Sequence, residues 1–211
     1  MAFPESWDNY FLISITRRGG SEIQFGSVVD PTSLEITEGE QQSESMPNAA
    51  GGRIWKDDPK SDGEISFDFV DLELDTASGV GLFQQYIGKA GGEGTAYDTS
   101  EPLATEISGW DAGVNRVRDQ FRVVVLFTND PAATAAAAAT AVSTDSLRFA
   151  AHNCKFVNLE HNFSDGQKKA TATFKFKPFR KDGTQMNYQW DSGDQTALGA
   201  LGTYNTTNFP N

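Results

Sequence analysis

Apolar and polar residues alternate along much of the chain with the period of two that predicts half-buried β-strands. Phe11, Ile13 and Ile15 near the amino terminus, for example, alternate with more polar neighbours. Strands of this kind are predicted over residues 10–15, 21–29, 34–37, 64–69, 154–163 and 170–179. Residues 121–127 are apolar at nearly every position, which predicts a strand covered on both faces. The pattern therefore predicts a mainly β fold with central strands and strands that face water on one side.

Helical signals are confined to one segment and one insertion. Val80, Phe83 and Ile87 recur at spacings of three and four, which predicts a helix over residues 78–90 that packs on the sheets. A change of phase at Val70–Asp71 predicts a β-bulge after the strand at 64–69. The Ala-rich stretch within residues 129–145 lacks large apolar side chains, so we expect a surface insertion with at most a short helix.

Three polar segments, residues 39–63, 91–120 and 181–211, are too long for simple hairpin turns. Long loops in compact domains are usually functional or disordered. The last segment carries isolated aromatic residues among Gly, Asn and Thr, which suggests that they dock on another surface; they are Tyr188, Trp190, Tyr204 and Phe209. An arm folded against its own domain is the alternative.

The 211 residues suit a single domain and carry a formal net charge of −12. A negative surface repels a phosphate backbone, so we do not expect the protein to bind nucleic acid. Residues 1–145 hold 24 acidic and 9 basic side chains, whereas residues 146–211 hold 5 and 8. Such an asymmetry favours attraction between copies, although solvated faces of different sign explain it equally well.

No apolar run approaches the roughly 18 residues of a membrane span, so we expect no membrane association and a protein that stays where it is made unless an assembly carries it. Cys154 is the only cysteine, which excludes an internal disulfide and fits a reducing compartment.

The chain offers little for catalysis. His152 and His161 match no metal-binding spacing, and the single thiol supplies no second ligand. Clustered carboxylates at 68–75 leave a glycosidase-like pair as the one enzymatic alternative, but no run of aromatic residues accompanies them. We therefore expect no enzyme activity, no metal and no cofactor.

Residues 33–54 join a strand that ends in acidic residues to a loop of small residues containing Gly51-Gly52. This segment resembles the tail tube proteins of tailed viruses, either bacteriophages or archaeal viruses. The order that follows is similar too: an alternating strand, one helix, a β-rich second half and a carboxyl-terminal arm.

The resemblance implies a two-sheet β-sandwich or barrel with one flanking α-helix over residues 1–182, a long stacking loop at 39–63, the Ala-rich insertion at 129–145 and an arm at 183–211. It also implies hexameric rings that stack into a hollow tube through which viral DNA passes without specific binding. The expected partners are other copies of the chain and tail proteins such as the terminator, the baseplate or tip and the tape measure. The protein would be made in the host cytoplasm and reside in the tail of the virion.

By this resemblance, two groups of residues are candidate contacts between subunits or rings: Met46, Arg53, Ile54 and Trp55 in the loop, and Tyr188, Trp190, Tyr204 and Phe209 in the arm. Glu64, Ser66 and Asp68 are the favoured lining of the channel. A basic face is the alternative lining: Lys169, Thr171, Thr173, Lys175 and Lys177.

Two other functions remain open at this point. A monomeric β-sandwich that binds a ligand such as a carbohydrate would explain the strands and the aromatic residues. The tube protein of a contractile injection system would share the fold and differ in what passes through it.

Overall fold

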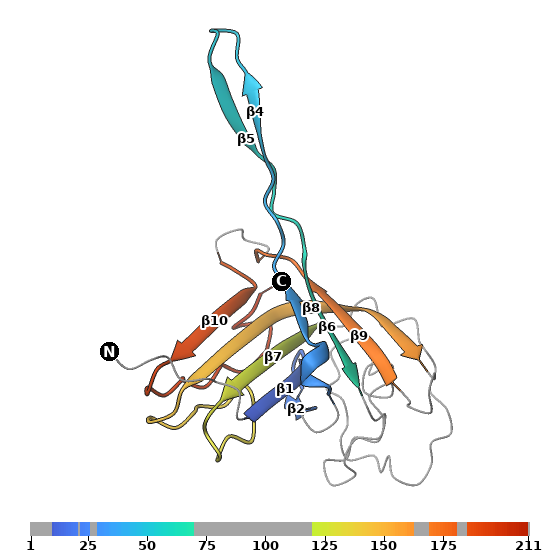
Figure 1. Cartoon of the computed structure of the whole chain (residues 1–211), viewed down its shortest axis with the longest axis vertical. Coiled ribbons are helices and arrows are strands. Elements are labelled where there is room, and N and C mark those ends of the chain that lie inside the picture. The colour runs from blue at the N-terminus through green and yellow to red at the C-terminus, as the bar shows by residue number, and fades with distance from the viewer. Residues whose placement is uncertain are drawn as a thin grey trace.

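The computed structural model describes residues 10–20, 22–25, 29–69, 120–162, 169–180 and 185–210. Its body consists of two antiparallel sheets that share one long strand, β8 (Figure 1). The first sheet contains β1 (Tyr10–Arg17), β2 (Glu22–Gln24), β7 (Phe121–Thr128), the first part of β8 (Ser146–Asn162) and β10 (Tyr188–Gly193). The second contains the rest of β8, β9 (Lys169–Phe176), β6 (Gly63–Phe69) and β3 (Glu35–Thr37).

The mainly β prediction with two sheets is confirmed. The predicted helix at 78–90, the bulge at 70–71 and most of the polar segment 91–120 lie outside the described residues. Within the strand predicted over 21–29, Glu22–Gln24 pairs with β1 and the Phe25 amide donates to the Ile13 carbonyl at 2.8 Å, while residues 21 and 26–28 lie outside the described residues. A short 3-10 helix, η1 (Pro31–Ser33), follows; Asp30 caps it by accepting a hydrogen bond from the Thr32 amide, and Pro31 supplies the first position.

Strand β8 changes sheets at Asn153. Residues Ser146–Cys154 pair with β7, whereas Lys155–Asn162 pair with β9, and the register of both pairings shifts near this point. Asn153 has φ 57°, in the left-handed region that asparagine tolerates better than most residues. Its side-chain Nδ2 donates to Asn187 Oδ1 at 2.9 Å, and its side-chain Oδ1 accepts from the Tyr204 hydroxyl at 3.0 Å. These contacts hold the turn of the strand in place.

The inner faces of the two sheets enclose one aromatic core. Phe174 of β9 lies at its centre, with ring centroids 5.4 Å from Phe156, 5.9 Å from Phe121 and 6.1 Å from Phe67. The alternation predicted for this strand is confirmed, because Ala170, Ala172, Phe174 and Phe176 are all buried. Each such ring removes a large apolar area from water and adds edge or stacking contacts.

The outer face of the first sheet is covered as well, which explains the apolar run in β7. Val124 and Leu126 of β7 pack there against Ala136 and Ala137, which are 0% and 5% exposed, and against Leu198 of the carboxyl-terminal segment. The Ala-rich segment predicted as a surface insertion at 129–145 thus also covers the sheet: its Ala136 and Ala137 are buried against β7, whereas Val142 is exposed. Small side chains allow this segment, which consists of turns, to lie close to the sheet.

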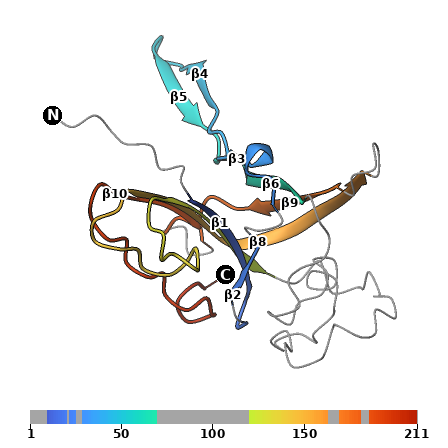
Figure 2. The ribbon, with the colours of Figure 1, turned by 60° about the horizontal axis from the view of Figure 1, so that its bottom comes forward.

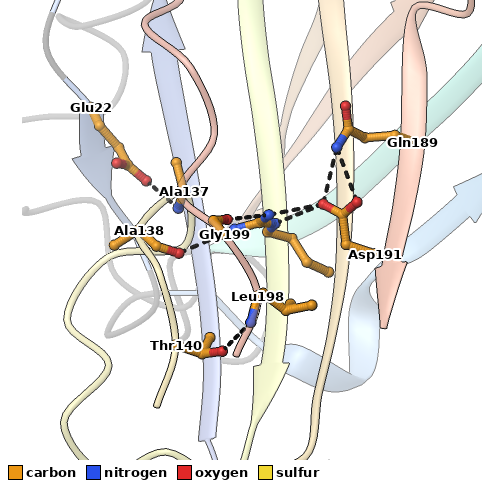
Figure 3. A network of polar contacts seen from close by, with 9 residues as sticks. Glu22, Ala137, Ala138, Thr140, Gln189, Asp191, Leu198 and Gly199 are labelled. Carbon is orange, nitrogen blue, oxygen red and sulfur yellow. Dashed lines mark hydrogen bonds and ion pairs between the residues drawn. The ribbon is translucent and has the colours of Figure 1, made fainter. Parts of the chain in front are cut away.

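Arg148 ties that covering layer to the sheet. Its guanidinium donates to Asp191 Oδ2 of β10 at 2.9 and 3.1 Å, to the Ala138 carbonyl at 3.1 Å and to the Gly199 carbonyl at 2.8 Å (Figure 3). The side chain is 3% exposed, so its charge depends on these acceptors. One arginine thus joins β8, β10, the Ala-rich segment and the carboxyl-terminal segment, and the predicted extended arm is folded onto its own domain.

Among the described residues, no helix is long and apolar enough to cross a membrane.

His152 provides a test of this packing. It is 1% exposed and stacks on Phe209 with ring centroids 4.1 Å apart, and burial, with a smaller contribution from nearby Arg122, lowers its pKa to about 3. Between pH 6.5 and 3 the unfolded chain binds a proton at this site and the folded chain does not, so the free energy of unfolding falls as the pH is lowered.

Between pH 7 and pH 5 we predict that the free energy of unfolding falls by about 2 kcal/mol more in the wild type than in His152→Phe, which has no group to protonate at this site. Urea unfolding of both proteins at both pH values measures this difference. An identical pH dependence in the two proteins would contradict a buried neutral histidine.

Candidate functional site

A β-hairpin formed by β4 (Ser43–Pro47) and β5 (Arg53–Asp57) projects from the body along the longest axis of the molecule (Figure 1). A second view shows it standing clear of both sheets (Figure 2). The segment predicted as a long loop at 39–63 therefore contains paired strands. Its turn is closed by Asn48, whose Oδ1 accepts from the amides of Ala50 at 3.1 Å and Gly52 at 2.9 Å, and Gly51 adopts φ 82°.

Apolar side chains are exposed on both faces of this hairpin. Met46 and Ile54 are direct cross-strand partners, 41% and 52% exposed, and they share one face. Trp55, 72% exposed, lies on the other face opposite Ser45, to which Arg53 donates a hydrogen bond at 2.7 Å. A two-stranded hairpin with little core of its own is marginally stable in water. Exposed apolar residues gathered on one element are typical of surfaces that bind a partner.

The two arms of the hairpin approach closely at its root. The amide of Ser61 donates to the Glu40 carbonyl at 2.9 Å, and the amide of Glu40 donates to Ser61 Oγ at 2.9 Å. A Cβ atom at Gly39 would lie 1.7 Å from the Ser61 carbonyl oxygen, so only glycine fits there.

Polar contacts to β10 fix the direction of the root. Glu38 accepts hydrogen bonds from Trp190 Nε1 at 2.7 Å and from the Tyr188 hydroxyl at 2.8 Å. Lys60, on the opposite arm, donates to the Tyr188 hydroxyl at 2.6 Å and lies 3.7 Å from Glu38. The hydrogen bond from Trp190, with those from Tyr188 and Lys60, lowers the pKa of Glu38, and the bond to Tyr188 raises the pKa of Lys60.

Strand β10 in turn rests on the core. The Trp190 ring lies 4.7 Å from the Phe149 ring, and Tyr188 is 9% exposed and packs 5.4 Å from Phe176. Trp190 remains 46% exposed. Tyr188 therefore supports the hairpin instead of presenting a free contact surface, while the role of Trp190 in a contact with another copy stays a prediction. The residues that sequence reasoning missed are Glu38 and Lys60, whose partners lie far away in the sequence.

Tyr204 and Phe209 are placed inside their own subunit, which corrects the prediction that they contact another one. Tyr204 is 1% exposed and Phe209 is 8% exposed. Phe209 stacks on His152, and its backbone carbonyl accepts from Arg18 at 2.9 Å. Burial raises the pKa of the Tyr204 hydroxyl, which is hydrogen-bonded to Asn153. The alternative of an arm folded on its own domain describes these residues.

The two candidate channel linings, one acidic and one basic, share a single face. Strands β6 and β9 pair so that Glu64, Ser66 and Asp68 lie opposite Lys175, Thr173 and Thr171. Glu64 forms an ion pair with Lys175 at 3.4 Å, and Asp68 accepts from Thr171 at 2.6 Å. The prediction that the acidic and the basic residues form two alternative surfaces is therefore wrong, because the register of β6 and β9 places them side by side on one face. That this face lines a channel stays a prediction.

Cys154 and His152, the candidate chemical groups that the structure describes in full, are both buried. Cys154 is 0% exposed and burial raises its pKa to about 12, so its thiol stays protonated. His152 is part of the packing described above. Among the described residues, no group of three or more His, Cys, Asp or Glu side chains is arranged to hold a metal ion.

No protein-family model matches the chain, and no curated protein matches it. Among solved structures, it is similar to the tube-terminating cap of the anti-feeding prophage, with TM-score 0.45, 11% identity and coverage of 92% of this chain and 95% of that chain. It is also similar to a chain of the anti-feeding prophage baseplate, with TM-score 0.44, 11% identity and coverage of 94% and 98%. A third is from the sheath/tube terminator of an extracellular contractile injection system, with TM-score 0.41, 10% identity and coverage of 90% and 99%.

The root contacts give a testable prediction. Glu38→Ala removes the acceptor of two hydrogen bonds, which we expect to cost about 1 kcal/mol after allowance for the exposure of Glu38. Hydrogen exchange at the Ser61 amide should then accelerate about five-fold.

The matched control is Glu44→Ala, which removes an exposed carboxylate on the hairpin away from the root. Equal exchange rates at Ser61 in Glu38→Ala and in the control would show that Glu38 does not hold the root.

Proposed function

We propose that this protein is the structural subunit of a viral tail tube, in which hexameric rings of the chain stack into a hollow conduit for the DNA genome. The proposal includes a non-catalytic role and a location in the tail of the virion. Its partners are other copies of the chain and the proteins that end or fill the tube.

The protruding hairpin carries this proposal. Met46, Ile54 and Trp55 expose apolar surface on both faces of a two-stranded element whose only described supports lie at its root. An element of this kind gains stability when a neighbouring copy covers it. A tube built by stacking supplies such a neighbour to every copy except those in the last ring.

Sheet edges supply the second kind of contact that a ring requires. Among the described strands, β10 pairs with β8 alone, and β3 pairs with β6 alone. Exposed edges of this type are covered in stable proteins, and pairing between neighbouring copies is one way to cover them.

The polar face of β6 and β9 suits a conduit. Glu64 and Asp68 neutralise or hydrogen-bond their cross-strand partners Lys175 and Thr171. A surface of paired charges on a chain with net charge −12 offers a phosphate backbone little net attraction. DNA would then pass along the part of this face around Asp68 and Thr171 without being held, while the end at Lys175 is left for contact with a neighbouring copy.

Shortening the hairpin tests the proposal. Residues 43–57 are replaced by an Asn-Gly turn, which the existing hydrogen bond from the Asp58 amide to the Gln42 carbonyl, 2.8 Å long, is positioned to close. We expect the circular dichroism spectrum and the melting temperature to stay close to wild type, because the hairpin is outside the core.

Electron microscopy and sedimentation velocity at high protein concentration should show tubes for the wild type and no tubes for the shortened variant. The point variants Trp55→Ser and Val142→Ser compare two apolar side chains of similar exposure, 72% and 74%, and only the first should impair assembly. A wild-type protein that remains monomeric, or normal tubes from the shortened variant, would overturn the proposal.

A further inference from the structure

A groove of about 790 Å³ lies beside the point where β8 changes sheets. Four of its lining residues are cationic and one is acidic. The cations are Lys155, Lys175, Lys177 and Arg180, and the carboxylate is Asp62. In a chain with a net charge of −12, this concentration of positive charge is unusual.

The lysines are arranged unfavourably for an isolated subunit. Lys155 and Lys175 are direct cross-strand partners, and Lys177, just past the end of β9, lines the same groove. Like charges placed directly opposite each other on a sheet destabilise it. Glu64 lies 3.4 Å from Lys175, whereas no carboxylate in the described part of the chain forms an ion pair with Lys155 or Lys177. An anionic group in the groove would relieve this repulsion.

Apolar side chains accompany the cations. Val157 and Phe179 also line the groove, and they are 52% and 45% exposed. The groove therefore suits an occupant that has both carboxylates and apolar side chains.

The β4–β5 hairpin has this composition. Its exposed carboxylates Glu44, Asp57 and Asp58 outnumber the two cations of the same stretch, Arg53 and Lys56. Its exposed apolar residues follow directly towards the tip. The hairpin points away from the body of its own copy, so this occupant comes from a neighbour (Figure 1).

We propose that the groove lined by Lys155, Lys177, Val157 and Phe179 receives the β4–β5 hairpin of a second copy of this chain. The inference rests on the proposed function and deepens it by naming the receiving surface. Hairpin carboxylates would approach Lys155 and Lys177, and the apolar side chains of the hairpin would cover Val157 and Phe179.

Cysteine pairs test the contact directly. The variant with Ile54→Cys and Val157→Cys should form intermolecular disulfides on oxidation of the assembled protein, seen as a ladder on a non-reducing gel. The control with Ile54→Cys and Val142→Cys places the second thiol at an exposed position outside the groove and should give no ladder. The native Cys154 is fully buried and does not compete. No ladder from the groove pair, or equal ladders from both pairs, would overturn the inference.

Charge reversal separates this inference from the proposed function. Lys177→Glu should reduce assembly at least ten-fold, measured as the fraction of pelleted protein, and adding Asp57→Lys on the hairpin should restore most of it. Val142→Glu, which adds an acid elsewhere, should assemble normally.

If the shortened hairpin blocks assembly while Lys177→Glu does not, the tube proposal stands and the groove is the wrong receiver. If Lys177→Glu leaves assembly intact but abolishes binding of a duplex oligonucleotide, the groove binds phosphate and the inference is overturned in favour of nucleic acid.

Discussion

The turn of β8 at Asn153 is the constraint on which the arrangement of this protein depends. Because the strand passes from one sheet to the other there, β10 and β9 pair with successive parts of the same strand. This places Tyr188 and Trp190 of β10 where Glu38 can reach them, and it places Lys155 opposite Lys175. The left-handed conformation of Asn153 and its contacts with Tyr204 and Asn187 maintain the turn. The supported root of the hairpin and the cationic groove are both consequences of it.

The body and the hairpin differ in how they are stabilised. The body has an aromatic core between its sheets and a second apolar layer under the Ala-rich segment. The hairpin has cross-strand hydrogen bonds, a polar root and exposed apolar side chains. A difference of this kind is expected of an element that reaches its final stability only in a complex. The hairpin and the groove on the same chain would then form a self-complementary pair that repeats along an assembly.

Local patterns were sufficient to predict most strands, because the alternation in β6 and β9 reflects burial of every second side chain. In β1 the alternation predicts the strand but not its burial, because residues 13–17 are all buried. They were insufficient wherever the partner of a residue is distant in sequence. The Ala-rich segment lacks large apolar residues and was predicted to lie on the surface, yet small residues pack closely on β7. Tyr204 and Phe209 were correctly identified as aromatic residues in need of a partner, but that partner is Asn153 and His152 of the same chain.

The register of β6 against β9 could not be predicted from the sequence either. The acidic and basic residues of one face were therefore predicted to form two surfaces. The residues of the hairpin and its root also differ in whether their partners are near or distant in the sequence. Met46, Ile54 and Trp55 are predicted as contacts from the resemblance to tail tube proteins, and this stays a prediction. Glu38 and Lys60 gave no signal because their role depends on contacts with β10. The receiving groove depends on the pairing of β8 with β9 and was missed for the same reason.

The central claim is that the hairpin is a contact between copies. Hydrogen exchange of the β4 and β5 amides, compared between dispersed subunits and the assembled protein, tests it most directly. We predict rapid exchange of these amides in the dispersed subunit and strong protection in the assembly, with the β7 amides protected in both states. Hairpin amides that exchange equally fast in both states would contradict it.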